Sequence, residues 1–385
     1  MTRRSGLMMG NIAIAEGAIA AGCRFFAGYP ITPANEISEH LSLRLPEEGG
    51  IFIQMEDELS SAGAVIGAIW GGMKGMTATS GPGFSLMQEH IGMAVSLEVP
   101  IIIALMQRVG PSGGGIGEMS GEIMQAKWGS QGDYSTIALA PWSCQECFDL
   151  TIEAFNQAGT WRVPVIIFGD ALLAHMFEPV IRPTEEERRD RVKEWPKHSG
   201  DPKKCNYFTY DDPVTKEPVV PPLPVIGTPY HPRWAFYGTH TPKGILSESE
   251  KVAFNLIRLI NDKINLNRDT IVRYDSRFME DAEIALICYG TVGRPVLRAV
   301  KEARSEGIKV GFLRLITVWP FADQIVEQVC HQVKVVIVPE MNYGQIIREV
   351  ERVGGGSGCR IQSYPKAGLH EASELLQRIK EAAKW

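Results

Sequence analysis

Three side chains of the sequence have the types and settings needed to bind an anionic ligand and to move a proton. Thr32 offers a hydroxyl within the segment 29–33 (YPITP), where two prolines fix the backbone around it. Arg108 follows the apolar run 101–106, and its guanidinium can bind a carboxylate through two parallel hydrogen bonds. Glu58 leads into an otherwise apolar helical pattern, where burial raises the pKa of a carboxyl group and suits it to proton transfer.

Thr32 and Arg108 also have a purely structural interpretation, whereas the structural interpretation of the acidic cluster accounts for the neighbours of Glu58 and not for Glu58 itself. Thr32 is well placed to cap a following helix, and Arg108 also fits a surface position beside a flexible, glycine-rich loop. The neighbours of Glu58, Glu56 and Asp57, suit a helix start because negative charge there offsets the helix dipole. Residue types and spacing alone therefore leave both interpretations open.

A tight glycine-proline turn, Gly81-Pro82-Gly83, follows the apolar run 76–80. Such a turn lets the backbone approach a ligand closely. Neither this turn nor the run Gly113–Gly115 has a glycine three residues further on, so neither matches the dinucleotide-binding fingerprint. The GxxxxGK[ST] phosphate loop is also absent from the sequence. The glycines therefore indicate a ligand other than a dinucleotide held in the usual way.

Short apolar runs alternate with helical patterns in the first half of the chain. Buried strands are expected at 25–29, 76–80, 101–106 and 165–170. Helices are expected at 12–21, 58–70 and 143–155, the last with a capping box at Ser143 and Glu146. This alternation predicts a parallel sheet covered on both faces, with ligands bound at the carboxyl ends of its strands. Thr32, the Gly81 turn and Arg108 each follow such a strand, so we expect them at one edge of the sheet.

A proline-rich stretch divides the chain. Of the 24 prolines, 12 lie within 179–242, and no helical or strand period runs through this stretch. Residues 179–246 are therefore predicted to form a connecting arm that wraps over a surface or a partner subunit, because loops of this length usually have a function. Residues 1–178 form one predicted domain and residues 247–385 a second.

The second predicted domain is also α/β in pattern. A helix is expected over 248–263, with a capping box at Ser247 and Glu250. Four apolar runs follow, each succeeded by a helical pattern, at 283–288 (EIALIC), 309–315 (KVGFLRL), 334–340 (KVVIVPE) and 359–365 (CRIQSYP).

Composition excludes several classes of function. The formal net charge is −6 over 385 residues without a basic block, which argues against nucleic acid or a membrane surface as a partner. The seven scattered cysteines favour a reducing, cytoplasmic setting over a disulfide framework. Cys144 and Cys147 form a single CxxC, which fits a redox pair or half a metal site, although we favour structural cysteines. The eight histidines show no ligand spacing, so no metal site is predicted in this chain.

Five segments in order make the chain resemble a known family. They are GNIAIAEGAIAAG from residue 10, FFAGYPITPANEI from 25, ATSGPGFSLMQE from 78, LRLITVWPF from 313 and VPEMNYGQI from 338. The sequence resembles the α subunits of 2-oxoacid:ferredoxin oxidoreductases, most closely the 2-oxoglutarate type (2-oxoglutarate synthase). The resemblance covers about residues 10–174 and 283–368, which is most of the chain.

The resemblance implies a fold, a cofactor and roles for the site residues. The fold would be a three-layer domain that binds the pyrimidine of thiamine diphosphate, followed by an α/β domain like the C-terminal domain of transketolase. Glu58 would hydrogen-bond the aminopyrimidine of the cofactor, Arg108 would pair with the substrate carboxylate, and Thr32 would lie beside the substrate carbonyl. The cofactor-binding residues would be Tyr29, Pro30, Ile31, Glu58, Gly81, Pro82 and Gly83.

The resemblance also implies an incomplete site that needs a partner. The enzyme would convert a 2-oxoacid and CoA to acyl-CoA and CO2 and pass electrons to ferredoxin. The chain lacks repeated CxxC pairs and the GDG-plus-Asn pattern that holds magnesium diphosphate. Mg2+ and a [4Fe-4S] cluster are therefore expected in a β subunit, with γ and δ subunits as further candidates, in an (αβ)2 or larger assembly. The isolated chain is expected to be inactive.

The substrate stays open at this point. After Ser112 the usual relative continues Thr-Gly-Leu-Pro, whereas this chain has Gly113–Gly115 and Ile116. That loop is expected to touch the substrate side chain, so pyruvate, branched-chain and aryl 2-oxoacids are alternatives to 2-oxoglutarate. A non-redox, transketolase-like thiamine enzyme subunit is the alternative from another reaction class.

Overall fold

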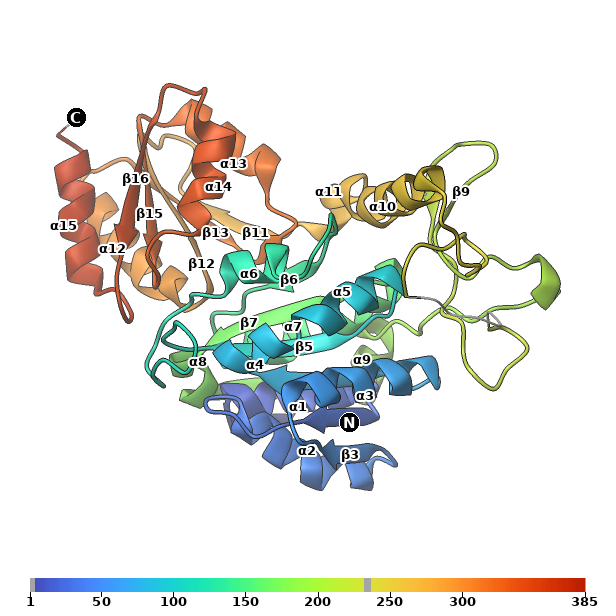
Figure 1. Ribbon diagram of the computed structural model, residues 1–385. Coiled ribbons are helices and arrows are strands. Elements are labelled where there is room, and N and C mark those ends of the chain that lie inside the picture. The colour runs from blue at the N-terminus through green and yellow to red at the C-terminus, as the bar shows by residue number, and fades with distance from the viewer. Residues whose placement is uncertain (1–3, 232–236, 385) are drawn as a thin grey trace.

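The computed structural model describes residues 4–231 and 237–384. Its larger sheet has seven strands (Figure 1), in the order β14 (Thr317–Trp319), β6 (Ile137–Leu139), β7 (Val165–Asp170), β5 (Ile102–Gln107), β4 (Gly75–Thr79), β2 (Phe25–Gly28) and β3 (Ile51–Gln54). The six strands from the first half of the chain pair in parallel, and only β14 is antiparallel to its neighbour. The predicted parallel sheet is confirmed, and β3 is an edge strand that the apolar pattern did not predict.

Helices cover both faces of this sheet. One core contains α1 (Gly10–Ala20), α2 (Asn35–Glu47) and α7 (Cys144–Trp161), and the other contains α3 (Glu58–Trp70), α4 (Gly81–Leu86) and α5 (Gln88–Ser96). Strand β5 serves both cores, because Ile103 and Leu105 point toward α3 while Ile102 and Met106 point toward α1. Every residue of β5 is buried, and the sequence from Ile102 to Met106 is accordingly apolar throughout rather than alternating.

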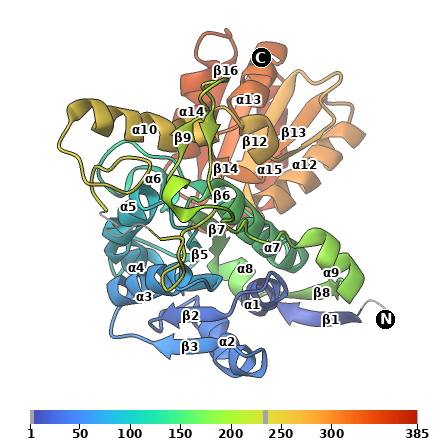
Figure 2. The same cartoon turned by 90° about the vertical axis from the view of Figure 1, so that its right-hand side faces the viewer.

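The second sheet has five strands, in the order β11 (Tyr274–Arg277), β13 (Val310–Leu315), β12 (Ile284–Tyr289), β15 (Val335–Glu340) and β16 (Arg360–Pro365). It is covered by α12 (Gly293–Ser305), α13 (Asp323–Gln332), α14 (Ile346–Gly354) and α15 (Ala372–Ala382). The four strands predicted from the apolar runs are confirmed, and Figure 2 shows this domain stacked on the first one. The two domains are also joined directly, because β14 pairs with β6 of the larger sheet.

The proline-rich arm contains more regular structure than its sequence suggested. Strand β8 (Phe177–Arg182) pairs with β1 (Arg4–Met9), and α9 (Glu185–Arg191) follows it. Thr184 and Glu187 form a complete capping box for α9. The expectation of no helix or strand in this stretch was therefore wrong, because capping and paired charges stabilise α9 without an apolar period. The short elements η1 (Pro202–Lys204), β9 (Tyr210–Asp211) and β10 (Pro218–Val219) follow.

Two predicted capping boxes were wrong in detail. Ser143 does accept a hydrogen bond from the backbone N–H of Glu146. The Glu146 side chain, however, accepts from the Trp142 N–H and from Arg314 of the second domain. Helix α10 (Glu250–Asn265) begins after Ser249 and has no side-chain cap.

The remaining described elements are short. They are α6 (Ile123–Trp128), α8 (Ala171–His175), α11 (Arg268–Ile271) and the turn η2 (Gly290–Val292).

A buried charged cluster ties the arm and α10 to the first domain. Lys263 donates to Glu98 at 2.7 Å, and both side chains are at most 2% exposed. Glu98 also accepts from the Thr209 backbone N–H at 2.7 Å, and Arg162 donates to the Tyr207 carbonyl at 2.6 Å. Burial alone would raise the pKa of Glu98, but the positive charges of Lys263 and Arg162 lower it below its usual value. The arm therefore packs on its own chain here (Figure 1).

Replacing Lys263 with methionine should lower the free energy of unfolding by about 3–5 kcal/mol. The change leaves the Glu98 carboxylate buried without its ammonium partner, which costs more than the exchange of apolar volume can offset. Urea unfolding of the purified chain measures the loss. Lys251→Met on the same helix is the matched control, because Lys251 is exposed and should change little. Equal losses in both variants would contradict this role of Lys263.

Candidate functional site

The three segments singled out from the sequence lie where neighbouring parallel strands end. The segment 29–33 follows β2, the Gly81 turn follows β4, and Arg108 follows β5. Arg108 spans the gap between two of them, because its Nη1 donates to the Thr32 carbonyl oxygen at 2.7 Å. The structure therefore brings Thr32, the glycine turn and Arg108 together at one edge of the sheet, as expected.

Glu58 is the first residue of α3 and lies against the glycine turn. Asp57 caps the helix through a 2.7 Å hydrogen bond from the Ser60 N–H, so the Glu58 side chain is not needed as a cap. Glu58 is 4% exposed, and burial raises the pKa of its carboxyl group. A Cβ atom at Gly83 would overlap the Glu58 carboxyl and the Thr79 hydroxyl. Glycine at 83 therefore leaves room for that carboxyl beside the turn.

The Arg108 guanidinium is held by two backbone carbonyls. Besides Thr32 it binds the Gly113 carbonyl at 3.1 Å, while its Nε is buried without a protein partner. The glycine-rich loop is a close-approach turn at this point. Gly115 N–H donates to the Val109 carbonyl at 3.0 Å, and Gly114 has φ +48°, where a Cβ would overlap Val109. This loop therefore holds the Arg108 side chain in place at the site.

Thr32 does not cap the helix that follows it. The N-cap of α2 is Ala34, which makes no side-chain cap, so the capping alternative was wrong. The Thr32 hydroxyl is half-buried and meets only the Asn35 amide, at 3.4 Å. Tyr29 and Pro30 are exposed beside it, and Ile31 is partly buried.

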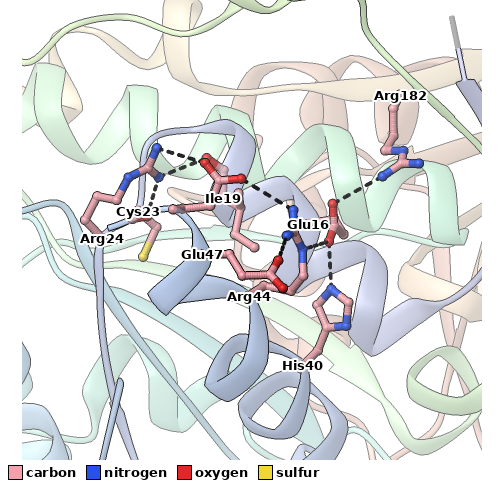
Figure 3. Close-up of polar contacts among 9 residues, drawn as sticks. Glu16, Ile19, Cys23, Arg24, His40, Arg44, Glu47 and Arg182 are labelled. Atoms are coloured by element: carbon pink, nitrogen blue, oxygen red, sulfur yellow. Dashed lines mark hydrogen bonds and ion pairs between the residues drawn. The ribbon is translucent and has the colours of Figure 1, made fainter. Parts of the chain in front are cut away.

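Helices α1 and α2 hold the Thr32 segment in place. The Asn11 amide donates to the Pro33 carbonyl at 2.7 Å and to Glu36 at 2.6 Å. Figure 3 shows a second connection between these helices. The Glu16 carboxylate of α1 lies 2.7 Å from His40 of α2 and also forms ion pairs with Arg44 and Arg182. Burial alone would raise the pKa of Glu16, but its hydrogen bonds to His40 and Arg44 lower it to about 2.

One site residue was missed from the sequence. Glu122 is the N-cap residue of α6, is 7% exposed, and has a buried Oε2 without a protein partner. Its Oε1 lies 3.4 Å from the point where a Cβ on Gly81 would be, and Arg108 Nε lies 3.8 Å from the same point. The signal was the one used for Glu58, a carboxyl directly before an apolar run, here Ile123-Met124.

Both cysteines of the CxxC pair are buried. Cys144 and Cys147 belong to α7 and contribute to the core. Burial raises the pKa of Cys144 to about 11 and that of Cys147 well above its usual value, which disfavours the thiolate that redox chemistry needs. Within residues 4–231 and 237–384, no group of His, Cys, Asp and Glu side chains is arranged to hold a metal ion. None of the helices in these ranges is both long and apolar enough to cross a membrane.

Two family models match the chain. Residues 16–227 match the thiamine-diphosphate-binding domain of pyruvate flavodoxin/ferredoxin oxidoreductases. Residues 282–366 match core domain II of pyruvate:ferredoxin oxidoreductase. A split-gene transketolase, described as an inactive β4 tetramer, has a TM-score of 0.53 at 10% identity over 97% of this chain and 96% of its own, so it shows the fold alone. The predicted fold class is therefore confirmed.

Curated relatives cover nearly the whole chain. A 2-oxoglutarate synthase subunit KorA of Methanothermobacter marburgensis is 45% identical over 97% of each chain. The KorA subunit of Methanocaldococcus jannaschii is 47% identical over 90% of this chain and 91% of its own. A ketoisovalerate oxidoreductase subunit VorB of Methanothermobacter marburgensis is 34% identical over 98% of this chain and 97% of its own.

A solved relative shares the architecture of this chain over 98% of its length. It is the 2-oxoglutarate:ferredoxin oxidoreductase of Magnetococcus marinus with 2-oxoglutarate, coenzyme A and succinyl-CoA bound, at a TM-score of 0.89 and 28% identity. The match covers 98% of this chain but 65% of the other, so this chain spans about two thirds of that protein. On these matches, the chain belongs to the thiamine-diphosphate-binding pyruvate flavodoxin/ferredoxin oxidoreductase family.

Proposed function

We propose that this chain is the α subunit of an enzyme that converts 2-oxoglutarate and CoA to succinyl-CoA and CO2 and transfers two electrons, one at a time, to ferredoxin. The observation that carries the proposal is the shared edge of the sheet, where a buried carboxyl and a free guanidinium donor flank a glycine turn. The full-length similarity to 2-oxoglutarate synthase subunits supports 2-oxoglutarate as the substrate.

The residues around Glu58 fit the pyrimidine of thiamine diphosphate. The absence of a Cβ at Gly83 lets the desolvated Glu58 carboxyl lie against the glycine turn, where it can meet a ring nitrogen of a flat heterocycle. When bound, the cofactor supplies a nucleophilic carbon and stores the electrons released by decarboxylation. Glu58 holds a proton at a ring nitrogen, for which a raised pKa is suited. Tyr29, Pro30, Ile31, Gly81 and Pro82 form the remaining contacts in this proposal.

Arg108 and Thr32 take the substrate in this proposal. The Arg108 guanidinium is positioned by two carbonyl oxygens and retains a free Nε–H for a carboxylate oxygen. The Thr32 hydroxyl, with a single weak contact at 3.4 Å, can donate to the oxygen of the ketone. The Arg108 guanidinium is therefore oriented before the substrate arrives, which lowers the entropic cost of reaching a reactive geometry.

The rest of the site is assigned to partner subunits. We propose that a β subunit supplies Mg2+, the diphosphate contacts and the [4Fe-4S] cluster, in an (αβ)2 or larger cytoplasmic assembly, with γ and δ subunits as further candidates. Large apolar side chains on the segments around the site support docking there, namely Leu86, Ile116, Trp128 and Tyr343, which are between 51% and 96% exposed. The predicted boundaries at residues 178 and 246 stay part of this proposal.

A panel of 2-oxoacids tests the proposal on the co-purified complex. With CoA and a low-potential dye, 2-oxoglutarate should give the highest kcat/KM, and the isolated chain should reduce no dye. A higher kcat/KM for pyruvate, or for the branched-chain acid suggested by the 34% identical VorB subunit, would contradict the assignment of 2-oxoglutarate as the substrate. Carboligation without dye reduction would instead favour the transketolase-like alternative.

A further inference from the structure

Besides the Ser80 hydroxyl, two buried hydrogen-bonding atoms of charged side chains at the candidate site have no protein partner. They are Arg108 Nε, at the end of β5, and Glu122 Oε2, at the start of α6. Both side chains border the position that a Cβ on Gly81 would occupy. Buried polar groups are rarely left without a partner, so two such atoms around one glycine point to a ligand that pairs with both.

Residues of the second domain hydrogen-bond the segment around Glu122. The Ser120 N–H donates to the Met341 carbonyl and the Asn342 amide donates to the Ser120 carbonyl, each at 2.8 Å. Gln345 accepts from the Met124 N–H at 2.9 Å. These contacts lie on both sides of Glu122 along the chain. The backbone from which the Glu122 side chain projects is therefore held in place.

The charges around Glu122 set its protonation. Burial raises the pKa of its carboxyl to about 7, and neighbouring backbone N–H groups and the Arg108 charge oppose this rise only in part. Glu58 is a further acid at the same edge and is also affected by the Arg108 charge. On α6, the Lys127 Nζ forms an ion pair with Oε1 of Glu349 at 3.2 Å. Behind the segment, Tyr289 and Glu340 are buried, and burial raises the pKa of both groups.

We propose that Glu122 is a substrate-binding residue that, in its protonated form, donates a hydrogen bond to a carboxylate of the 2-oxoacid beside the Arg108 Nε–H. The two donors match the two oxygens of one carboxylate. Once ionised, Glu122 presents a second negative charge to the same carboxylate and weakens binding. This inference rests on the proposed function and adds a specificity residue to it.

The KM for the 2-oxoacid as a function of pH tests the inference in the assembled complex. In the wild-type enzyme, KM should rise roughly tenfold between pH 6.5 and 8.5, because a carboxyl with a pKa of about 7 loses its proton over this range. Glu122→Gln keeps an N–H donor that does not ionise, so its KM should stay low and vary little with pH. Glu122→Ala should raise KM roughly tenfold at pH 6.5 and also flatten the profile.

Controls separate this inference from the proposed function and from folding. Glu89→Gln changes an exposed acid on α5 and should keep the wild-type profile. Co-purification with the partner subunit checks that each variant folds. A Glu122→Gln profile that rises like the wild-type one, or a flat wild-type profile, overturns the inference while turnover persists. Absence of turnover with every 2-oxoacid overturns the proposed function, and the inference with it.

Two substrates identify which carboxylate is bound. 2-Oxoglutarate carries a carboxylate at each end, whereas 2-oxobutyrate carries only the one beside the ketone. A pH-dependent KM that Glu122→Gln removes for both substrates assigns the carboxylate beside the ketone. The same effect for 2-oxoglutarate alone assigns the distal carboxylate. Absence of the effect for both overturns the inference.

Discussion

Replacing Glu58 with alanine should lower the turnover of the assembled complex by roughly 10³-fold, which is within the usual range for removing a general acid or base. The proposed function places the Glu58 proton at a cofactor nitrogen, and the Glu58 carboxyl is the one that a Cβ on Gly83 would overlap. Dye reduction at saturating 2-oxoglutarate and CoA measures the loss. Because the lost interaction is with cofactor, kcat should fall more than the KM for either substrate rises.

A matched variant and a stability measurement distinguish this role from a structural one. Glu56→Ala removes an exposed acid two residues earlier and should leave turnover within about twofold. Burial of Glu58 raises its pKa, so at neutral pH the folded state gains no stability from its charge. The urea midpoint of Glu58→Ala should therefore match or exceed that of the wild type. Near-normal turnover would contradict the catalytic role, and a large loss of stability would indicate a structural one.

The sequence was informative where chemistry and local pattern coincide. Glu58 begins the predicted helix 58–70, and the structure places that helix at the same residues. Thr32 and Arg108 each follow an apolar run, and parallel strands bring such positions to one edge. These features depend on short stretches of chain, so residue spacing was sufficient to predict them.

Features that depend on distant segments were not predicted. Glu122 belongs to the site because the segment around Met341 and Gln345 holds it, more than 200 residues away in the chain. Strand β14 is a three-residue piece of the second domain and joins the first sheet, which no apolar run could indicate. The Glu146 side chain likewise leaves its expected cap because Arg314 forms a partly buried ion pair with it at 2.7 Å. In each case a tertiary contact outweighs the local preference.

Replacing Arg108 with alanine should raise the KM for 2-oxoglutarate roughly 10- to 100-fold and leave the KM for CoA almost unchanged. Hydrogen bonds to a charged group contribute about 1.5–3 kcal/mol, which corresponds to this range. Arg108→Lys should recover little of the loss, because lysine lacks the Nε–H and cannot bind the Thr32 and Gly113 carbonyls while it faces the substrate. Initial rates with each substrate varied in turn measure both constants.

The control for Arg108 is an arginine without a ligand role. Arg298→Ala removes a guanidinium that is 73% exposed on α12 and should change neither constant. If Arg108 only braced its loop, Arg108→Ala would disturb the Gly113 turn and raise the two KM values together, whereas a carboxylate partner affects the 2-oxoacid alone. An unchanged KM for 2-oxoglutarate would remove the proposed role. A selective rise would make the guanidinium at the end of β5 the group by which this site recognises an acid.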